Sequence, residues 1–363
     1  MSSNGFWNLF PAPKYLQMPA IGLDLSDQSV KYVQLERVSG SYSVKQFGNK
    51  AIPAGLIEGG EIKQKEKLIE FLKTIKEEMG QDFVVASLPE EKGFLSQIEL
   101  PDIGEEDIRN VLELQIENYV PISGYDAIFD YEIVERFKSK DKAGVIVSAS
   151  AFPSALVKDY RDVLTGAGFK LLALETETNS LARAVVKEGD NSTQMIVDFG
   201  KTRTTFVVVS NQRIELTSTI NVAGDSLTNA IMRDFGVDFF QAERIKKEYG
   251  FVKNKEYEKF FNSLLPVILV IKDEMSKHIN YWGTHMVKSG GNSGEIKKII
   301  LSGGDSSLRG FSDFLSYQLR LPVEMCNPWI NIMDFDERIP EIDLRQAMVY
   351  SVALGLALRP FVK

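Results

Sequence analysis

One pattern occurs twice in the chain, and it constrains the fold more than any other feature. The stretch Ile21–Leu35, IGLDLSDQSVKYVQL, has an aspartate at the end of an apolar run and returns to apolar sequence through small polar residues. The stretch Met195–Val209, MIVDFGKTRTTFVVV, aligns with it without a gap, so that Asp24 matches Asp198. One copy alone is typical of an ordinary β-hairpin. Both copies continue into a third strand-like run, and a repeat of this length predicts two related halves that face each other.

Strand-like and helix-like segments alternate around the two hairpins, which predicts an α/β layer fold. Residues 61–80 carry apolar side chains at helical spacing and stop at a glycine, whereas residues 83–89 form a short β-branched run closed by proline. Residues 94–151 give a compact block of strand, helix and two strands. We expect a flexible arm at 1–19, a first domain at 20–190 with an inserted subdomain at about 90–152, and a second domain at 191–363 with a mostly helical subdomain at about 226–297.

Charge and cysteine content exclude several classes of protein. The net charge of −8 and the lack of a basic stripe disfavour a protein that binds the nucleic-acid backbone. The single cysteine, Cys326, excludes an internal disulfide and a cysteine-cluster metal site. The longest apolar runs, LLPVILVI and VALGLAL, are far shorter than the about 20 residues that a membrane-spanning helix needs. We therefore expect a cytoplasmic protein with no nucleic-acid partner and no membrane span.

Four further segments follow in an order that resembles one known family. They are IELPDIGEEDIRNVLELQIENYVP, ETNSLARA, LSGGDSSLRGFSDFLSYQLRLPVE and YSVALGLALRP. Together with the two hairpins, they resemble the PilM family of type IV pilus assembly proteins, a relative of the cell-division protein FtsA in the actin-like ATPase superfamily. The resemblance covers about residues 20–360. It implies an actin-like ATPase fold, with two duplicated βββαβα-type domains that flank a nucleotide cleft and an FtsA-like inserted subdomain.

The resemblance implies that ATP and Mg²⁺ bind between the two hairpins. Asp24 and Asp198 would hold Mg²⁺ through water, since Mg²⁺ prefers a few carboxylates together with phosphate oxygens. The resemblance assigns to the first phosphate loop Asp24, Ser26, Gln28 and Ser29, and to the second Asp198, Gly200, Lys201, Thr202 and Thr204. It assigns to the nucleoside side Gly224, Asp225, Glu243, Lys246, Gly303, Gly304 and Asp305.

The first phosphate loop departs from the family pattern at two positions. Ser26 stands where the family usually has glycine, and a non-glycine residue pays a conformational penalty at positive φ. Asp27 adds a negative charge beside the expected phosphates. These departures predict a first loop of different shape and leave the ATP affinity open.

Glu177 is the candidate catalytic residue. The resemblance implies that it orients the attacking water, a role that a carboxylate fills well. The alternative is that Glu177 only ties the two halves together. Because the first loop is altered and no clear base is evident, we expect slow or absent ATPase activity.

The resemblance also implies a membrane partner. We expect the cytoplasmic N-terminal tail of a PilN-like inner-membrane protein to bind in a groove beside the inserted subdomain, and the protein to reach the inner membrane through it. Ile108, Ile116 and Tyr119 are the candidate groove residues, because apolar residues there cover more of a helix than one stripe. Pilus assembly or retraction ATPases and self-association are further expectations. An FtsA-like division filament and an actin-like small-molecule kinase stay open as alternatives.

Overall fold

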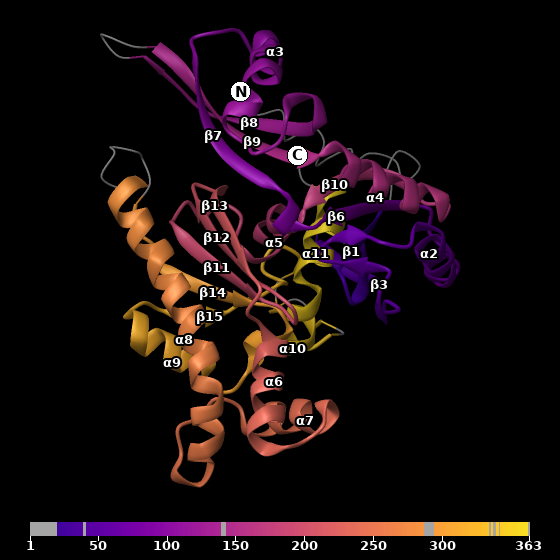
Figure 1. The fold of residues 1–363 in the computed structure, drawn as a ribbon. Helices are drawn as coiled ribbons and strands as arrows, with labels where there is room; N and C mark the ends of the chain where they lie inside the picture. The colour runs from indigo at the N-terminus through magenta and orange to yellow at the C-terminus, as the bar shows by residue number, and fades with distance from the viewer. Residues whose placement is uncertain are drawn as a thin grey trace.

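The computed structural model describes most of the chain (Figure 1). The predicted N-terminal arm, residues 1–19, lies outside the described residues. The described residues are 20–38, 41–138, 143–286, 294–333, 335–336, 339–340 and 342–361.

Two five-stranded mixed sheets form the centre of the molecule, and they have the same design. The first has the strand order β10-β6-β1-β2-β3, and the second has the order β13-β12-β11-β14-β15. In each sheet an antiparallel three-strand meander precedes two parallel strands. The repeated hairpin is therefore part of a repeated sheet. The strands are β1 (Ile21–Leu25), β2 (Ser29–Val38), β3 (Ser41–Ala51), β6 (Phe83–Leu88), β10 (Lys170–Thr176), β11 (Gln194–Phe199), β12 (Thr204–Ser210), β13 (Arg213–Ile220), β14 (Lys298–Ser302) and β15 (Val323–Met325).

Helices cover both faces of both sheets. Helices α5 and α11 lie between the sheets and share one apolar core with the facing sides of both. Helices α2 and α4 cover the outer face of the first sheet, and α6, α8 and α9 cover that of the second. Strands buried on both faces are apolar almost throughout, as IGLDL is. The helices are α2 (Lys65–Met79), α4 (Ser154–Gly166), α5 (Glu177–Val185), α6 (Gly224–Phe235), α8 (Glu258–Tyr281), α9 (Phe311–Leu319) and α11 (Ser351–Leu358).

The central helices α5 and α11 cross at a glycine. A Cβ atom on Gly355 would lie 1.7 Å from the carbonyl oxygen of Ser180, which no real contact allows. Since the two halves of the molecule meet along these helices, this close approach fixes how near the two sheets come to each other.

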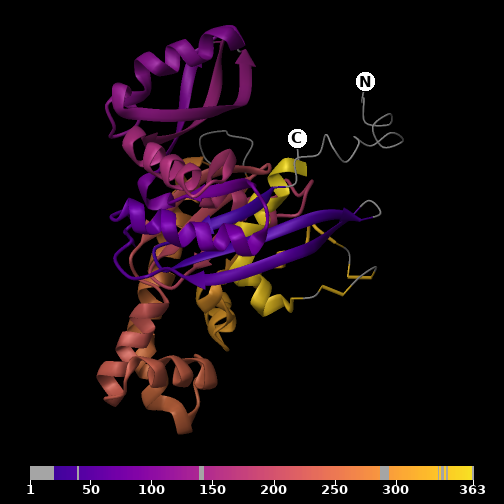
Figure 2. The same cartoon turned by 90° about the vertical axis from the view of Figure 1, so that its right-hand side faces the viewer.

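A small subdomain lies beyond the end of the first sheet. Its antiparallel sheet has the order β7-β9-β8, with α3 packed on one face. Figures 1 and 2 place this subdomain at one end of the molecule and helix α7 at the other. Its elements are β7 (Phe94–Pro101), α3 (Glu105–Gln115), β8 (Ala127–Lys138), β9 (Ala143–Pro153) and the 3₁₀ turns Ile116–Asn118 and Gly124–Asp126.

No helix in the described part of the chain has the length and apolar character needed to cross a membrane.

Short elements connect the layers described above. The remaining elements are β4 (Ile57–Glu58), β5 (Glu61–Ile62), α7 (Phe239–Tyr249), α10 (Leu344–Ala347), the π-helical turn Trp282–Met286 and the 3₁₀ turns Glu90–Lys92, Lys255–Tyr257, Gly304–Ser307, Met348–Tyr350 and Arg359–Phe361.

Candidate functional site

The carboxyl ends of the parallel strands in the two sheets face each other and gather acidic side chains. This is the edge at which open α/β sheets usually bind ligands. Asp24 lies near the end of β1 and is 5% exposed, and Asp198 lies near the end of β11. The Asp24 carboxylate accepts hydrogen bonds from Lys31 Nζ at 3.1 Å and from Ser87 Oγ at 3.2 Å. We call this space, bounded by Asp24, Asp198, Lys31, Glu177 and Arg203, the phosphate cleft.

Two aspartates lie close enough in the phosphate cleft that the charge of one raises the pKa of the other. Burial raises the pKa of Asp198 to about 6, and the neighbouring Asp24 carboxylate adds to the rise. The cations Lys31 and Arg203 oppose it. Two buried carboxylates so placed favour a bound cation between them.

The first hairpin turn accommodates Ser26 without a positive φ. The backbone N–H of Ser26 donates to the Ser29 carbonyl oxygen at 3.0 Å, and its hydroxyl donates to the same oxygen at 3.0 Å. Serine therefore closes the turn with two hydrogen bonds and needs no left-handed backbone. In the described part of the chain, the non-glycine residues with positive φ are Asn211, Gln212 and Arg320.

The Asp27 carboxylate is surrounded by hydrogen-bond donors. Its two carboxylate oxygens accept hydrogen bonds from the backbone N–H groups of Gly59 at 3.0 Å and Gly60 at 2.9 Å, in the turn between β4 and β5. The Arg203 guanidinium lies 3.9 Å away. The predicted repulsion of phosphate by Asp27 is therefore largely compensated within the protein.

Glu177 begins α5 and faces the cleft. Its carboxylate lies 3.1 Å from Arg203 Nη2, and its other oxygen accepts a 3.5 Å hydrogen bond from the Glu90 backbone N–H. Burial raises the pKa of Glu177 to about 8, although Arg203 opposes the rise. Glu177 is thus placed where it could hold water, and it also bridges the two halves of the molecule. The catalytic role and the structural role both stay predictions for this residue.

We expect Glu177→Gln to stabilise the protein at alkaline pH. With a folded pKa of about 8 against an ordinary 4.5, native Glu177 keeps a proton that the unfolded chain releases, so wild-type stability falls as pH rises through this window. Glutamine does not ionise and removes that loss. Thermal melts should favour the variant by on the order of 2 kcal/mol at pH 9 and show little difference at pH 4. An unchanged pH dependence in the variant would contradict this assignment.

The second hairpin turn is joined to helix α6. The backbone N–H groups of Gly224 and Asp225 donate to the carbonyl oxygens of Gly200 at 3.1 Å and Lys201 at 2.8 Å. The Lys201 ammonium lies over the Phe239 ring, 5.3 Å from its centroid. The first amides of α6 are therefore occupied, and any phosphate contact from this side comes from the turn and from side chains.

Thr204 corrects one of the predicted contacts. It is fully buried, and its hydroxyl donates to the Val222 carbonyl oxygen at 2.6 Å. Its hydroxyl therefore fixes the end of the hairpin and does not face the cleft. Thr202 instead lines a space of about 360 Å³ that Asp27 and Arg203 also border.

A buried lysine organises the predicted nucleoside side. Lys246 is 2% exposed, and its ammonium lies 2.8 Å from Asp305 Oδ1 and 2.7 Å from Glu243 Oε1. It also donates to the Gly224 carbonyl oxygen at 3.3 Å. Two carboxylates and a carbonyl compensate the cost of burying this charge. Glu243 and Lys246, predicted to act together, are thus in contact.

At Gly303, the predicted nucleoside side lies next to Asp198 of the phosphate cleft. Its φ is +89°, and a Cβ atom there would lie 2.7 Å from Asp198 Oδ1. A Cβ on the following Gly304 would have Val349 as its nearest neighbour at 3.6 Å. Across the cleft, Gln28 Nε2 donates to Asp225 Oδ2 at 3.5 Å. Gly303 is thus needed because the chain passes close to the end of β11, and the role of the glycine pair in nucleotide binding stays a prediction.

The candidate partner residues need correction. Ile108 and Ile116 are completely buried in the core of the small subdomain, so neither can line a groove. Tyr119 is 41% exposed and remains available. The apolar residues cover a wide arc of this segment because the sheet and the turn after α3 enclose it together, and periodicity alone does not separate that arrangement from an open groove.

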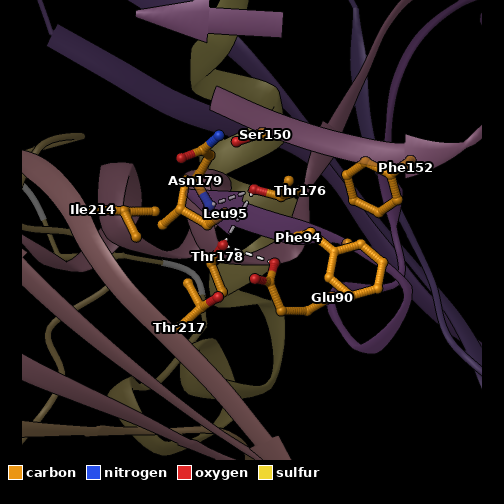
Figure 3. A pocket seen from close by; sticks show the side chains of 11 residues that line it. Glu90, Phe94, Leu95, Ser150, Phe152, Thr176, Thr178, Asn179, Ile214 and Thr217 are labelled. Atoms are coloured by element: carbon orange, nitrogen blue, oxygen red, sulfur yellow. Dashed lines mark hydrogen bonds between the residues drawn. The ribbon is translucent and has the colours of Figure 1, made fainter. Parts of the chain in front are cut away.

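A small pocket lies where the small subdomain meets both sheets. Figure 3 shows Glu90 and Thr178 pointing toward each other in it, and Thr178 Oγ1 donates to Glu90 Oε2 at 2.7 Å. The enclosed space is about 10 Å³, enough for about one water molecule. We call it the junction pocket; its lining residues are Glu90, Gly93, Phe94, Leu95, Ser150, Phe152, Thr176, Thr178, Asn179, Ile214 and Thr217.

Sequence reasoning missed the two cations of the phosphate cleft. Lys31 lies in a strand whose neighbours Val30 and Tyr32 are buried, and a lysine inside such a run was the available signal. Arg203 follows Thr202 in the second turn, where an arginine reads as an ordinary solvated residue. Only the fold brings its guanidinium to the carboxylates of Glu91 and Glu177.

Comparison with known proteins gives one family match. The family model described as type IV pilus assembly protein PilM matches residues 22–361. Among solved structures, the chain is similar to the PilM-PilN type IV pilus biogenesis complex, with 22% sequence identity and a TM-score of 0.78 over 96% of this chain and 100% of that chain.

Two more distant structures share the fold. The ethanolamine utilization protein EutJ from Carboxydothermus hydrogenoformans is 17% identical, with a TM-score of 0.53 over 93% of this chain and 89% of that chain. MreB5 of Spiroplasma citri bound to ADP is 15% identical, with a TM-score of 0.55 over 93% of this chain and 94% of that chain. The predicted actin-like ATPase fold is confirmed, and the family match favours neither the division-filament nor the kinase alternative.

Proposed function

The chain belongs to the PilM family of type IV pilus assembly proteins, and from this membership we propose that it is an ATP-binding scaffold of the pilus inner-membrane assembly platform. In this role it binds the cytoplasmic N-terminal tail of a PilN-like membrane protein, and that contact holds it at the cytoplasmic side of the inner membrane. The observation that carries the nucleotide half of the proposal is the pair Asp24 and Asp198, which face each other from two copies of the same hairpin.

The side chains of the phosphate cleft fit a magnesium nucleotide. In the described residues, no three acidic, histidine or cysteine side chains form a ready-made metal site, so Mg²⁺ would depend on Asp24, Asp198, water and phosphate oxygens. Bound there, Mg²⁺ would neutralise phosphate charge. Lys31 would add a positive charge on the phosphate side. The Asp225 Oδ1 atom is buried without a hydrogen-bond partner, which supports a polar ligand beside it.

Glu243, Lys246 and Asp305 would form the nucleoside side. Their mutual ion pairs leave the Lys246 ammonium fixed, and a ribose would compete for the outer oxygens of the two carboxylates. Gly303 and Gly304 would let the nucleoside approach the backbone closely. Gly200 and Thr202 would contact phosphate from the second turn, while Ser26, Gln28 and Ser29 would do so from the first.

The partner tail would bind where the small subdomain meets the rest of the molecule. The junction pocket lies at this boundary and combines apolar side chains, Phe94 and Leu95, with unpaired strand edges nearby. The junction pocket holds only about 10 Å³. A tail would therefore bind along its rim, or the small subdomain would move away from the two large sheets to admit it. Tyr119 is the remaining candidate from the helical side of the subdomain.

We also propose a division of the chain that follows the duplicated sheets. Residues 20–190 form the first domain with its insertion at about 90–152, and residues 191–363 form the second with the mostly helical part at about 226–297. The identical strand order of the two five-stranded sheets supports this division. Self-association and contacts with pilus assembly or retraction ATPases remain proposals of the same kind.

We expect ATP turnover to be slow enough for a switch. With a pKa of about 8, Glu177 is mostly protonated at neutral pH, and it lies against Arg203, so it is a poor base in this conformation. Steady-state release of phosphate should stay below about 1 per second, the lower end of ordinary enzyme rates. A measured rate within the range of metabolic enzymes would contradict this expectation, and adding a small-molecule acceptor should not accelerate release.

The proposed function is tested by two titrations of the purified wild type. Calorimetry with MgATP should show saturable binding that disappears when Mg²⁺ is removed. A synthetic peptide of the N-terminal tail of the PilN-like protein from the same organism should bind, and a scrambled peptide should not. Absence of nucleotide binding would refute the nucleotide half, and absence of peptide binding would refute the partner half.

A further inference from the structure

Arg203 connects the second half of the molecule to three carboxylates of the first half. It lies in the turn between β11 and β12, and its side chain is 13% exposed. It forms ion pairs with Glu91, with Glu177 at 3.1 Å and with Asp27 at 3.9 Å. Although burial opposes it, these carboxylates raise the pKa of Arg203 above its ordinary value. The guanidinium is therefore always charged, and the surrounding carboxylates compensate its burial.

Two dipeptides separate the phosphate cleft from the junction pocket. In the first, Glu91 pairs with Arg203 on the cleft side, while Glu90 lines the pocket. In the second, Glu177 pairs with Arg203, while Thr178 lines the pocket. In each dipeptide, one residue thus faces the phosphate cleft and the other residue lines the junction pocket. A backbone shift at Glu91 or Glu177 would therefore also move Glu90 or Thr178 in the pocket.

The pocket side of this wall is itself joined by hydrogen bonds. Thr178 Oγ1 donates to the buried carboxyl group of Glu90 (Figure 3). The Glu90 backbone N–H donates to the Glu177 carboxylate. Thr217 of β13 lies on the facing wall of the same pocket. The junction pocket is therefore lined by residues from both halves of the molecule and from the small subdomain. A shift of Glu90 would change how the small subdomain packs against the two large sheets.

A terminal phosphate in the cleft would compete for Arg203. The carboxylates of the cleft, which are Asp24, Asp27, Glu91, Glu177 and Asp198, outnumber its cations, Lys31 and Arg203. Lys31 is already paired with Asp24. Guanidinium binds phosphate oxygens as readily as carboxylates, in the same forked geometry. An added phosphate would therefore draw Arg203 from Glu91 and Glu177.

We propose that Arg203 senses whether a terminal phosphate occupies the cleft and transmits that state to the junction pocket through Glu90–Glu91 and Glu177–Thr178. The proposal rests on the proposed function, because it requires a nucleotide in the phosphate cleft. It adds a direction of control: a nucleoside triphosphate and a diphosphate set different positions of the pocket wall. By linkage, a partner bound at the pocket would change the affinity for the two nucleotides by the same factor.

Hydrogen exchange of the full-length protein tests this coupling. The probes are a non-hydrolysable MgATP analogue and MgADP, each at saturation as measured by calorimetry. In the wild type, amide exchange in residues 90–95 should differ between the two states by at least about threefold. In Arg203→Ala the difference should vanish when each nucleotide is added at a concentration that calorimetry shows to saturate the variant itself. Lys298→Ala, which removes a cation at the far end of β14, should behave as the wild type.

A second variant keeps the test decisive if Arg203→Ala does not fold. Glu91→Gln keeps the size of the side chain and removes one of the two routes from Arg203, so it should reduce the difference. Equal exchange in the two wild-type states, or an undiminished difference in a folded variant, would overturn the proposal. If calorimetry shows that the wild type binds neither nucleotide, the proposed function has failed and the coupling with it. Nucleotide binding without a response would overturn the coupling alone.

Discussion

Asp198→Ala should abolish Mg²⁺-dependent ATP binding and leave the fold intact. Asp198 is one of the two carboxylates between which we place Mg²⁺, and burial together with Asp24 already raises its pKa to about 6. Removing it takes away the charge that would balance the metal. We expect the affinity to fall about 100-fold or more, equivalent to about 2.7 kcal/mol. Calorimetry with MgATP measures the loss, and thermal melting checks the fold.

The matched control is Asp130→Ala, an exposed aspartate in β8 of the small subdomain. It should bind MgATP as the wild type does. Asp198→Ala should melt no lower than the wild type at neutral pH, because it relieves the repulsion between two buried carboxylates. A folded Asp198→Ala protein that keeps its affinity for MgATP would rule out the site between the two hairpins.

Leu95→Asp should prevent binding of the partner tail. Leu95 lies in β7, lines the junction pocket and is only half buried, and none of the apolar cores of the described residues includes it. A tail that covered this position would have to desolvate an unpaired carboxylate, which costs several kcal/mol. We expect the affinity for the synthetic tail peptide to fall at least about 100-fold, while the affinity for MgATP stays unchanged.

Leu114→Asp provides the control for this change. Leu114 belongs to the same subdomain but is 81% exposed on α3, so the same substitution should leave peptide binding intact. Ile116→Asp would not serve, because Ile116 is completely buried and a charge there would unfold the subdomain. Equal loss of binding in both leucine variants would place the tail elsewhere, as would normal binding by folded Leu95→Asp protein.

The fold could be read from the sequence because its main signals are local or repeated. The helix expected over residues 61–80 appears as α2, and it ends where predicted, at Gly80 with φ of +62°. The aligned hairpins led to two sheets with the same strand order, although neither copy alone distinguishes a nucleotide fold from a plain hairpin. Repetition thus supplied the long-range information that single segments lack.

The site could be read only in part, because its charges interact across long sequence separations. Asp24 and Asp198 stand at strand ends, where the pattern marks them, but Arg203 reaches Glu91 over more than a hundred residues. The serine at position 26 predicts a first loop of different shape, but the sequence does not reveal the hydrogen bond by which the serine hydroxyl closes the turn. The apolar arc around Ile116 was assigned to a partner because periodicity does not reveal which neighbours enclose a helix.

The central claim is that a protein partner, and not the lipid, brings this chain to the membrane. Direct attraction to an anionic bilayer should be weak, because the net charge of the chain is −8. The most direct measurement is co-sedimentation of the wild type with anionic vesicles, either bare or displaying the tethered N-terminal tail of the PilN-like protein. We predict that the protein pellets with tail-bearing vesicles and stays in the supernatant with bare ones. Equal binding to both kinds of vesicle would contradict the account.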